Sequence, residues 1–268
     1  MNQNQNTGQD KNFIGIDDPN TPVYRIYPLW FFQQALRLKQ LVLVQPHSWP
    51  DPYEQLPWRC KIIKKRPEVW QAMTAPYLWL VFAQCWSATD ESETLLRAYS
   101  RVVKHPISSR NLFPGEEGVT VRSTPQNLLR ALQKWAPPGQ ENCCFIGRVK
   151  YFNDEGVRER IGEFFSQRSP EQKISPRQMA DLMLLKRSTF EHENEVRLIY
   201  VETRKEPPPD RISIPIEPNE IFSGVRFDPR LDGLELKERK ESVQKFGFDG
   251  EFEKSTLYSV VLLTIMID

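Results

Sequence analysis

Short apolar stretches separated by proline and polar clusters predict many short β-strands along this chain. Each stretch spans four to eleven residues, is rich in β-branched and aromatic residues, and is bounded by turn-forming residues, which is the pattern expected of strands. The predicted strands are residues 23–27, 41–45, 78–87, 119–122, 143–152, 193–201, 211–216, 221–227 and 257–267.

Between these strands, apolar residues recur at helical spacing. Thr124 followed by Pro125 is typical of a helix start, because threonine caps the first turn and proline fits its first position. The predicted helices are residues 29–39, 67–73, 91–103, 126–135, 156–165, 176–185 and 234–246. Strands and helices mix without regular alternation, so we expect an α+β fold: a single domain over residues 21–268 with a curved mixed β-sheet flanked by helices.

Residues 1–20 are rich in Asn, Gln and Asp, and we expect a disordered tail there. This start has no basic segment followed by an apolar core, so it does not predict a signal peptide. The apolar run at 257–267 is too short to span a bilayer and predicts a buried strand instead. A cytoplasmic protein without membrane contact is the expectation.

Composition excludes some classes of function. The chain has 268 residues with 36 basic and 35 acidic side chains, a formal net charge of +1, which gives no bulk reason to expect a nucleic-acid or membrane surface. The four cysteines form no Cys-x-x-Cys motif, so neither a zinc site nor a disulfide framework is predicted.

Candidate chemistry concentrates at the start of the strand predicted at 193–201. Glu193, Glu195 and Arg197 are two residues apart and share a face of an extended chain. Carboxylates at the edge of a core have shifted pKa values, as catalytic groups do. The alternative interpretations are a solvated acidic turn and a structural ion pair between Arg197 and one of these glutamates.

Five short motifs follow one another along residues 22–230. They are Tyr24-Arg25-Ile26-Tyr27, Pro50-Asp51-Pro52-Tyr53-Glu54, Cys85-Trp86-Ser87, Gly118-Val119-Thr120-Val121 and the segment from Phe190 to Arg197. In this order they resemble the bacterial domain of unknown function 2971 family. Pro50 replaces the asparagine of that family's loop, and Trp86 stands where phenylalanine is commoner.

The order of an early arginine, a serine ending a central strand and a late Glu-x-Glu is similar to the Arg-Ser-Glu arrangement of the ADP-ribosyltransferase superfamily. That resemblance implies that Arg25 grips the phosphate or ribose of NAD and that Ser87 supports the nicotinamide ribose. It also implies that Glu195 stabilises an oxocarbenium-like transition state, while Glu193 orients the acceptor. NAD would be the substrate, and the acceptor an unidentified protein or nucleic acid.

Other residues of the same motifs are assigned to NAD binding by the resemblance: Tyr24, Trp86, Asp51 and Arg197. Each has a structural alternative. Trp86 is also typical of a core residue, and Asp51 together with Glu54 is typical of side chains that pin a proline-rich loop. Arg25 could be a surface cation and Ser87 a helix cap.

Three hypotheses of function follow. The first is an NAD-consuming enzyme, either an ADP-ribosyltransferase or an NAD glycohydrolase, in a bacterial defence or toxin setting. The second is a metal-dependent nuclease or phosphohydrolase in which Asp51, Glu54, Glu193 and Glu195 hold magnesium near Lys186. The third is a non-catalytic sensor or partner-binding domain, which would show an exposed apolar patch and no deep cleft.

Overall fold

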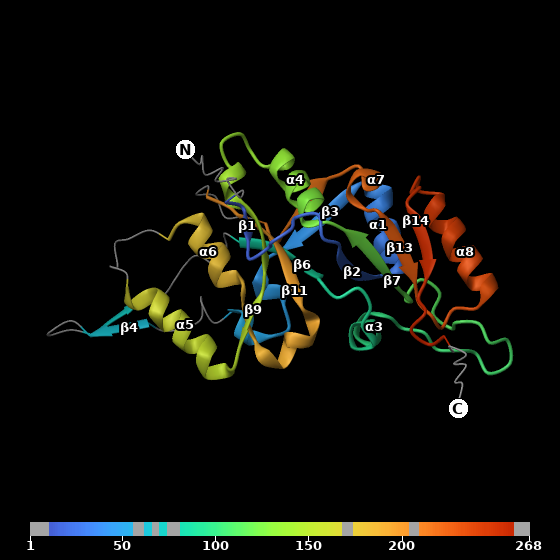
Figure 1. The fold of residues 1–268 in the computed structure, drawn as a ribbon, viewed down its shortest axis with the longest axis horizontal. Helices are drawn as coiled ribbons and strands as arrows, with labels where there is room; N and C mark the ends of the chain where they lie inside the picture. Colours follow the sequence, from blue (N-terminus) through green and yellow to red (C-terminus); the bar gives the residue numbers. More distant parts are fainter. Residues whose placement is uncertain are drawn as a thin grey trace, which may run out of the picture. The chain divides into compact units, whose positions relative to one another are not determined.

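The computed structural model describes residues 11–55, 62–65, 70–73, 81–167, 174–203 and 209–259. They fall into two compact units, described separately below. Unit 1 comprises residues 1–23, 40–88 and 124–216, and unit 2 comprises residues 24–39, 89–123 and 217–268. Figure 1 labels the helices and strands of both units.

The sheet of unit 1 is mixed. Its strands follow the order β1 (Phe13–Ile14), β8 (Cys144–Arg148), β11 (Glu195–Val201), β6 (Val81–Ser87), β3 (Gln40–Val44) and β12 (Arg211–Pro215). β1 pairs with β8 in parallel, and the remaining neighbours are antiparallel. β11 therefore lies between β8 and β6, and all seven of its residues are buried.

Helices cover the two faces of β11 (Figure 1). α4 (Pro125–Trp135) contacts β8, β11 and β12, and its Trp135 ring meets Tyr200 edge-on at 5.1 Å. α6 (Pro176–Met183) contacts β11 as well, and its Met179 and Met183 share a core with Ile199. β11 thus carries apolar side chains on both faces, as its nearly continuous apolar sequence predicts.

The remaining elements of unit 1 lie in its connections. The proline-rich segment after β3 forms two short 3₁₀ turns, η1 (Pro46–Ser48) and η2 (Pro52–Gln55). β9 (Lys150–Phe152) pairs in parallel with β10 (Leu185–Arg187), beside α5 (Asp154–Ser166). A third 3₁₀ turn, η5 (Ser188–Glu193), leads into β11, and η4 (Glu141–Cys143) leads into β8.

Unit 2 is built around a second run of strands. β2 (Val23–Pro28), β7 (Gly118–Ser123), β13 (Gly224–Phe227) and β14 (Glu251–Lys254) follow one another, with β13 antiparallel to β7 and parallel to β14. α1 (Leu29–Leu38) and α8 (Gly233–Gln244) contact each other, and the Phe32 ring packs against Phe222 and Phe248. α3 (Glu93–Tyr99) and α7 (Pro218–Ile221) complete the unit.

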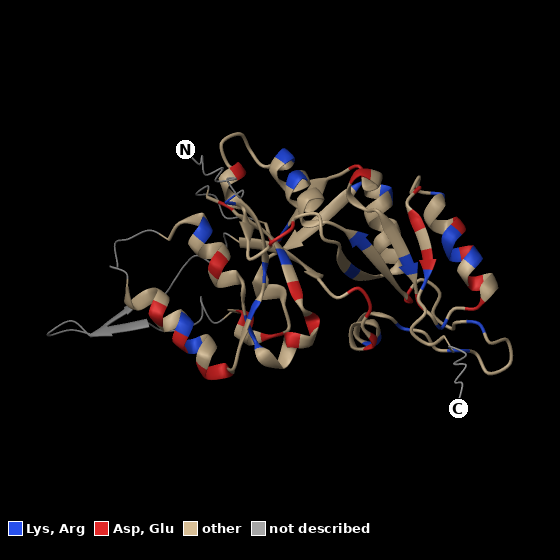
Figure 2. Ribbon diagram, viewed as in Figure 1, with Lys and Arg blue, Asp and Glu red and all other residues tan. Residues whose placement is uncertain are grey.

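The predicted fold class is confirmed: strands and helices are mixed, and the sheet contains parallel and antiparallel pairs flanked by helices. One domain over residues 21–268 stays a prediction. No helix in the described residues is long and apolar enough to cross a membrane. Acidic and basic residues are interspersed along α5 and α8 (Figure 2).

Several predicted elements need correction. Residues 67–73 were expected to be helical, but β5 (Trp70–Met73) is a strand paired with β4 (Ile62–Lys65). The strand expected at 143–152 divides into β8 and β9. The strand expected at 221–227 begins at Gly224, because Pro218 starts the short helix α7 before it.

At each end of the chain, part of the predicted segment lies among the described residues and part outside them. Within the tail predicted at 1–20, Phe13 and Ile14 form β1 against β8 and are buried. The expectation of disorder is therefore wrong for this part of the tail. Two apolar residues are enough here to add a short strand at the edge of the sheet. Residues 1–10 lie outside the described part of the chain. Most of the strand expected at 257–267 lies outside it too, and Leu257 is in a turn.

Candidate functional site

The candidate residues of the late Glu-x-Glu motif lie at one end of β11 in unit 1. In the antiparallel register with β6, Glu195 stands opposite Ser87 and Arg197 opposite Cys85. Cross-strand partners share a face, so these four side chains belong to one side of the sheet. Ile199 and Val201 continue that face into the apolar core under α6, which places the charged residues at the rim of the core.

The turn before β11 fixes the position of both glutamates. Asn194 adopts a left-handed backbone with φ of 43°, a conformation that asparagine tolerates better than most residues. Its N–H donates to the carbonyl of Glu191, and its own carbonyl accepts from Ala88 N–H at 2.8 Å. The Ser87 hydroxyl donates to the Glu193 carbonyl at 2.7 Å. Ser87 therefore ties the end of β6 to the turn that carries Glu193.

The Glu195 carboxylate is buried and surrounded by donors. Arg197 Nε donates to Oε1 at 3.0 Å, and Arg197 Nη2 donates to Oε2 at 2.9 Å. Lys186 Nζ donates to Oε2 at 3.0 Å, and the Cys85 thiol also hydrogen-bonds to this carboxylate. A carboxylate has about four acceptor positions, so Glu195 has no acceptor position left for a substrate hydroxyl in this arrangement.

Lys186 is the centre of a larger group of charges. Its ammonium contacts Glu193 Oε2 at 2.6 Å, Glu195 Oε2 at 3.0 Å and Glu54 Oε1 at 3.1 Å. Glu54 also accepts a 2.5 Å hydrogen bond from Arg197 Nη2. We call these five residues, Glu54, Lys186, Glu193, Glu195 and Arg197, the charge cluster.

Arg197 makes two further contacts with its guanidinium outside the charge cluster. Its Nη1 donates to the Met183 carbonyl at 2.6 Å, and its guanidinium lies over the Trp49 ring, 4.6 Å from the ring centre. The residues facing it across the two neighbouring strands, Cys85 and Gly147, are both small. The space beside Gly147 is filled by Leu184 and Ile14, which a Cβ at this position would meet.

Mutual attraction determines the direction of the pKa shifts of Glu195 and Lys186, whereas burial determines that of Glu54. Burial alone would raise the pKa of Glu195, but the charge and hydrogen bonds of Arg197, followed by the charge of Lys186, lower it to about 2. Burial would likewise lower the pKa of Lys186, yet Glu195 and Glu54 raise it. Burial raises the pKa of Glu54, and its two cationic neighbours offset this only in part. Glu195 is therefore ionised at neutral pH.

Exposure separates the two glutamates of the motif. The side chains of Glu195 and Arg197 are 3% and 1% exposed, and Lys186 is 7% exposed, whereas Glu193 is 22% exposed. Among the described residues, no hydrogen bond to Glu193 Oε1 is found. Three carboxylates and two cations give the ionised cluster a formal charge of −1, and Glu193 is its most accessible carboxylate.

Asp51 joins a second group next to the charge cluster. Its Oδ1 accepts from Arg187 Nη2 at 2.9 Å and from Tyr53 N–H at 3.0 Å. The Arg187 guanidinium lies 4.1 Å from the centre of the Tyr53 ring and 5.3 Å from that of Phe190. Asp51 therefore holds the proline-rich loop against β10, which agrees with the structural interpretation of this residue.

The other residues assigned to NAD binding lie in different surroundings. Trp86 is buried in unit 1 and donates from Nε1 to Gln84 at 2.9 Å. Tyr24 and Arg25 belong to β2 in unit 2, where the Arg25 guanidinium lies 4.9 Å from the Tyr27 ring centre. Burial raises the pKa of Tyr24, as does Asp90, to which it hydrogen-bonds.

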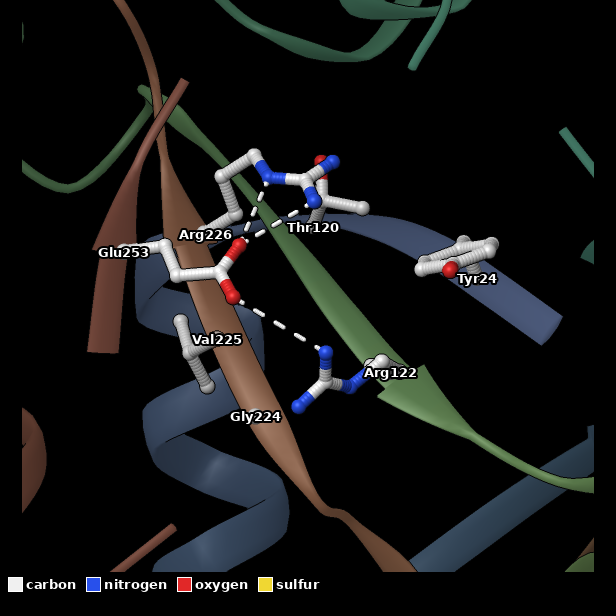
Figure 3. Close-up of a pocket in the computed structure, with 7 residues that line it drawn as sticks. All are labelled: Tyr24, Thr120, Arg122, Gly224, Val225, Arg226 and Glu253. Carbon is white, nitrogen blue, oxygen red and sulfur yellow. Dashed lines mark hydrogen bonds and ion pairs between the residues drawn. The ribbon is translucent and has the colours of Figure 1, made fainter. Parts of the chain in front are cut away.

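Tyr24 lines a shallow pocket of unit 2 that also contains two arginines (Figure 3). Arg226 donates to Glu253 at 3.1 Å and to Asp90 at 2.8 Å, while Arg122 pairs with Glu251 and lies 3.8 Å from Glu253. Because three carboxylates neutralise two guanidiniums, this pocket does not favour an anion such as phosphate.

The metal-dependent hypothesis required four carboxylates to gather. Glu54, Glu193 and Glu195 do gather, but the ammonium of Lys186 lies between them, and Asp51 pairs with Arg187 instead. In the part of the chain that the structure describes, no group of three or more His, Cys, Asp and Glu side chains has an arrangement that could hold a metal ion.

Comparison with known proteins gives a distant likeness. No protein-family model matches the chain, and no curated protein matches it, so the resemblance to the domain of unknown function 2971 family stays a prediction. Among solved structures, Thermus sp. 2.9 DarT in complex with NAD⁺ is similar with a TM-score of 0.38 and 12% identity, covering 89% of this chain and 96% of that chain. Thermus sp. 2.9 DarT in complex with ADP-ribosylated ssDNA gives a TM-score of 0.39 and 12% identity, covering 89% and 95%. Scores this low do not establish a shared activity.

The metal-dependent hypothesis placed Lys186 near Glu54, Glu193 and Glu195, and these residues do lie together. The sequence did not indicate that the ammonium occupies the centre of the group, or that Glu54 is a second partner of Arg197. Lys186 and Glu54 stand in predicted functional segments, but they come from separate elements, β10 and η2. The signal present in the sequence was a lysine nine residues before Glu195, which by itself indicates no contact.

Proposed function

We propose that this chain is an ADP-ribosyltransferase-like enzyme that consumes NAD and transfers ADP-ribose to an acceptor or to water. The observation that carries the proposal is the charge cluster. It holds an ionised Glu195 and a surface-accessible Glu193 side by side, with a formal charge of −1. The acceptor class, protein or nucleic acid, and a bacterial defence or toxin setting in the cytoplasm belong to the same proposal.

A fixed negative charge suits this reaction. Breaking the bond between the ribose C1′ and nicotinamide sends the bonding electrons to nicotinamide and leaves positive charge on the ribose. Carboxylates held in place before the reaction stabilise that charge without having to reorganise. Since the acceptor positions of Glu195 are filled, its contribution is electrostatic rather than a hydrogen bond to the ribose.

Glu193 takes the role that needs contact with a reactant. Its carboxylate reaches the surface and keeps one oxygen, Oε1, without a hydrogen bond among the described residues. In the proposed reaction it orients the acceptor, whose lone pair forms the new bond to C1′, and receives the proton that the acceptor loses. Ser87 contributes by holding the Glu193 carbonyl.

The remaining assignments of NAD-binding residues stay proposals that rest on the superfamily resemblance: Arg25, Tyr24, Trp86, Asp51 and Arg197. Of these residues, Arg25 can be tested by steady-state kinetics. An arginine that binds phosphate contributes to affinity, so Arg25→Met should raise the KM for NAD more than it lowers kcat.

Incubation of the purified protein with NAD tests the proposal. Nicotinamide release is followed by chromatography, and transfer is followed by mass spectrometry of added protein and single-stranded nucleic acid. Glu193→Gln should reduce transfer more than it reduces hydrolysis, because it removes the group that orients the acceptor. Glu159→Gln, an exposed substitution on α5, is the matched control and should leave both unchanged. Absence of nicotinamide release with every acceptor would refute the proposal.

A further inference from the structure

We infer that Lys186 is a positioning residue whose ammonium holds the carboxylates of Glu193 and Glu195 side by side. Its importance for catalysis rests on the function proposed above. Its effect on the two carboxylates does not, and can be measured without any substrate.

The ammonium of Lys186 uses all its hydrogens within the cluster. A lysine has three N–H donors, and three carboxylate oxygens lie 2.6, 3.0 and 3.1 Å from Nζ. These oxygens come from three elements, since Glu193 ends η5, Glu195 begins β11 and Glu54 lies in η2. One cation therefore joins segments that are far apart in the sequence.

Lys186 is itself held in a fixed place. In the parallel pair of β10 with β9 it stands opposite Tyr151, and the Tyr151 oxygen accepts a hydrogen bond from Glu195 N–H at 2.8 Å. Its ammonium also lies 4.9 Å from the centre of the Phe190 ring. The phenol of Tyr151, whose pKa burial raises to about 12, stays neutral and adds no competing charge at neutral pH.

The two glutamates depend on Lys186 to different degrees. Glu195 has Arg197 as a second cation, with two hydrogen bonds. Glu193 has no other cationic partner within salt-bridge distance among the described residues, and its side chain is partly exposed. Loss of the ammonium would leave three carboxylates facing one guanidinium, a formal charge of −2. Glu193 would then be both unpaired and repelled by Glu195.

Among the described residues, the groups that face Lys186 come from four packed elements. They are Glu54 of η2, Phe190 and Glu193 of η5, Glu195 and Arg197 of β11, and Tyr151 of β9. The Cys85 thiol of β6 hydrogen-bonds to Glu195. Cys85 stays protonated because burial, followed by the charge of Glu195, raises its pKa well above the usual value. The titration near neutral and acid pH therefore belongs to the carboxylates.

The test is a carboxyl-carbon NMR titration of glutamate side chains in the wild-type protein and in Lys186→Met, with signals assigned by Glu193→Gln and Glu195→Gln. We expect the pKa of Glu195 to rise by roughly one unit or more in Lys186→Met, the scale of losing an adjacent opposite charge. Lys186→Arg, which keeps the charge, should restore values close to wild type.

A double variant keeps the test decisive if Lys186→Met does not fold. Lys186→Met with Glu54→Gln removes one cation and one anion and so keeps the formal charge at −1. The pKa of Glu195 should still rise, because the ammonium that donates to its Oε2 is gone. An unshifted pKa of Glu195 in any folded variant without Lys186 would overturn the inference, and so would an equal shift in Lys186→Arg and Lys186→Met.

Measurements of NAD turnover distinguish a failure of the proposed role of Lys186 from a failure of the proposed function. If the protein turns over NAD, Lys186→Met should lower kcat with little change in KM and move the acid limb of the pH profile to higher pH, and Lys186→Arg should rescue both. A wild-type protein without NAD turnover would refute the proposed function, and the NMR titration would still decide the role of Lys186. An active Lys186→Met variant with an unshifted profile would refute the role of Lys186 alone.

Discussion

Glu195 and Arg197 lie two residues apart on one face of β11, and their side chains are joined by hydrogen bonds of 3.0 and 2.9 Å in a buried site. The motif that suggests chemistry is thus also an internal ion pair. Lys186 is a second partner of Glu195, and Glu54 is a second partner of Arg197. Substituting either member of the pair should therefore change the stability of the protein as well as any activity.

Arg197→Met should destabilise the protein strongly. It leaves two buried carboxylates with Lys186 as their one remaining cation in the cluster, and breaking a buried ion pair from one side costs about 3–5 kcal/mol. Urea denaturation measures the change. Arg160→Met, which breaks an exposed pair with Glu163 on α5, should cause little change. Equal stabilities of the two variants would show that the buried pair adds nothing.

Stability should fall in acid as Glu195 takes up a proton. Its pKa is about 2 in the folded protein against an ordinary value of 4.5, so the unfolded chain binds the proton more readily. The stabilising contribution is present above pH 4.5 and is lost as the pH falls from about 4.5 to 2. Thermal melting over this range measures it. Glu195→Gln should flatten this part of the profile, and an unchanged profile would contradict the assignment.

Ser87→Ala should loosen the turn before β11. The Ser87 hydroxyl is the donor to the Glu193 carbonyl, and losing a partly buried hydrogen bond of this kind costs about 0.5–1.5 kcal/mol. Hydrogen exchange of the Asn194 and Ala88 amides should become faster, because these groups belong to the same turn. Ser166→Ala, at the exposed end of α5, is the matched control. Unchanged exchange rates would show that the hydroxyl does not hold the turn.

Ile14→Ala should lower stability although it lies in the segment predicted to be a disordered tail. Ile14 is buried in the core with Met183 and Leu184, and shortening a buried isoleucine costs about 2–5 kcal/mol. Lys11→Ala, an exposed neighbour, should have little effect. Equal melting temperatures for the two variants would show that β1 is not docked.

The fold could be predicted from the sequence where local patterns determine it. The helix starting at Pro125 has the predicted threonine cap, with the Thr124 hydroxyl accepting from Asn127 N–H, and β11 follows from its apolar run. β1 and β5 were missed because each has few residues and gains its stability from a partner strand. A two-residue strand such as β1 leaves no periodic pattern to detect.

The site was predictable only in part for a similar reason. Glu193, Glu195 and Arg197 share one segment, so their proximity follows from strand geometry. Glu54 lies more than 130 residues before Lys186, and their 3.1 Å contact depends on how η2 packs near β10. Spacing within the sequence does not predict such a contact between distant segments. It also does not predict that hydrogen-bond donors surround the Glu195 carboxylate.

NAD turnover by the wild-type protein and by Glu195→Gln is the most direct test of the proposed function. The substitution keeps the shape of the side chain but removes one negative charge, which brings the formal charge of the cluster to zero. At a temperature where both proteins are folded, kcat should fall by roughly a hundredfold or more, the scale of losing one preorganised electrostatic group, while the affinity for NAD changes little. Wild-type protein that releases no nicotinamide, or a folded Glu195→Gln variant that turns over NAD at the wild-type rate, would contradict the account.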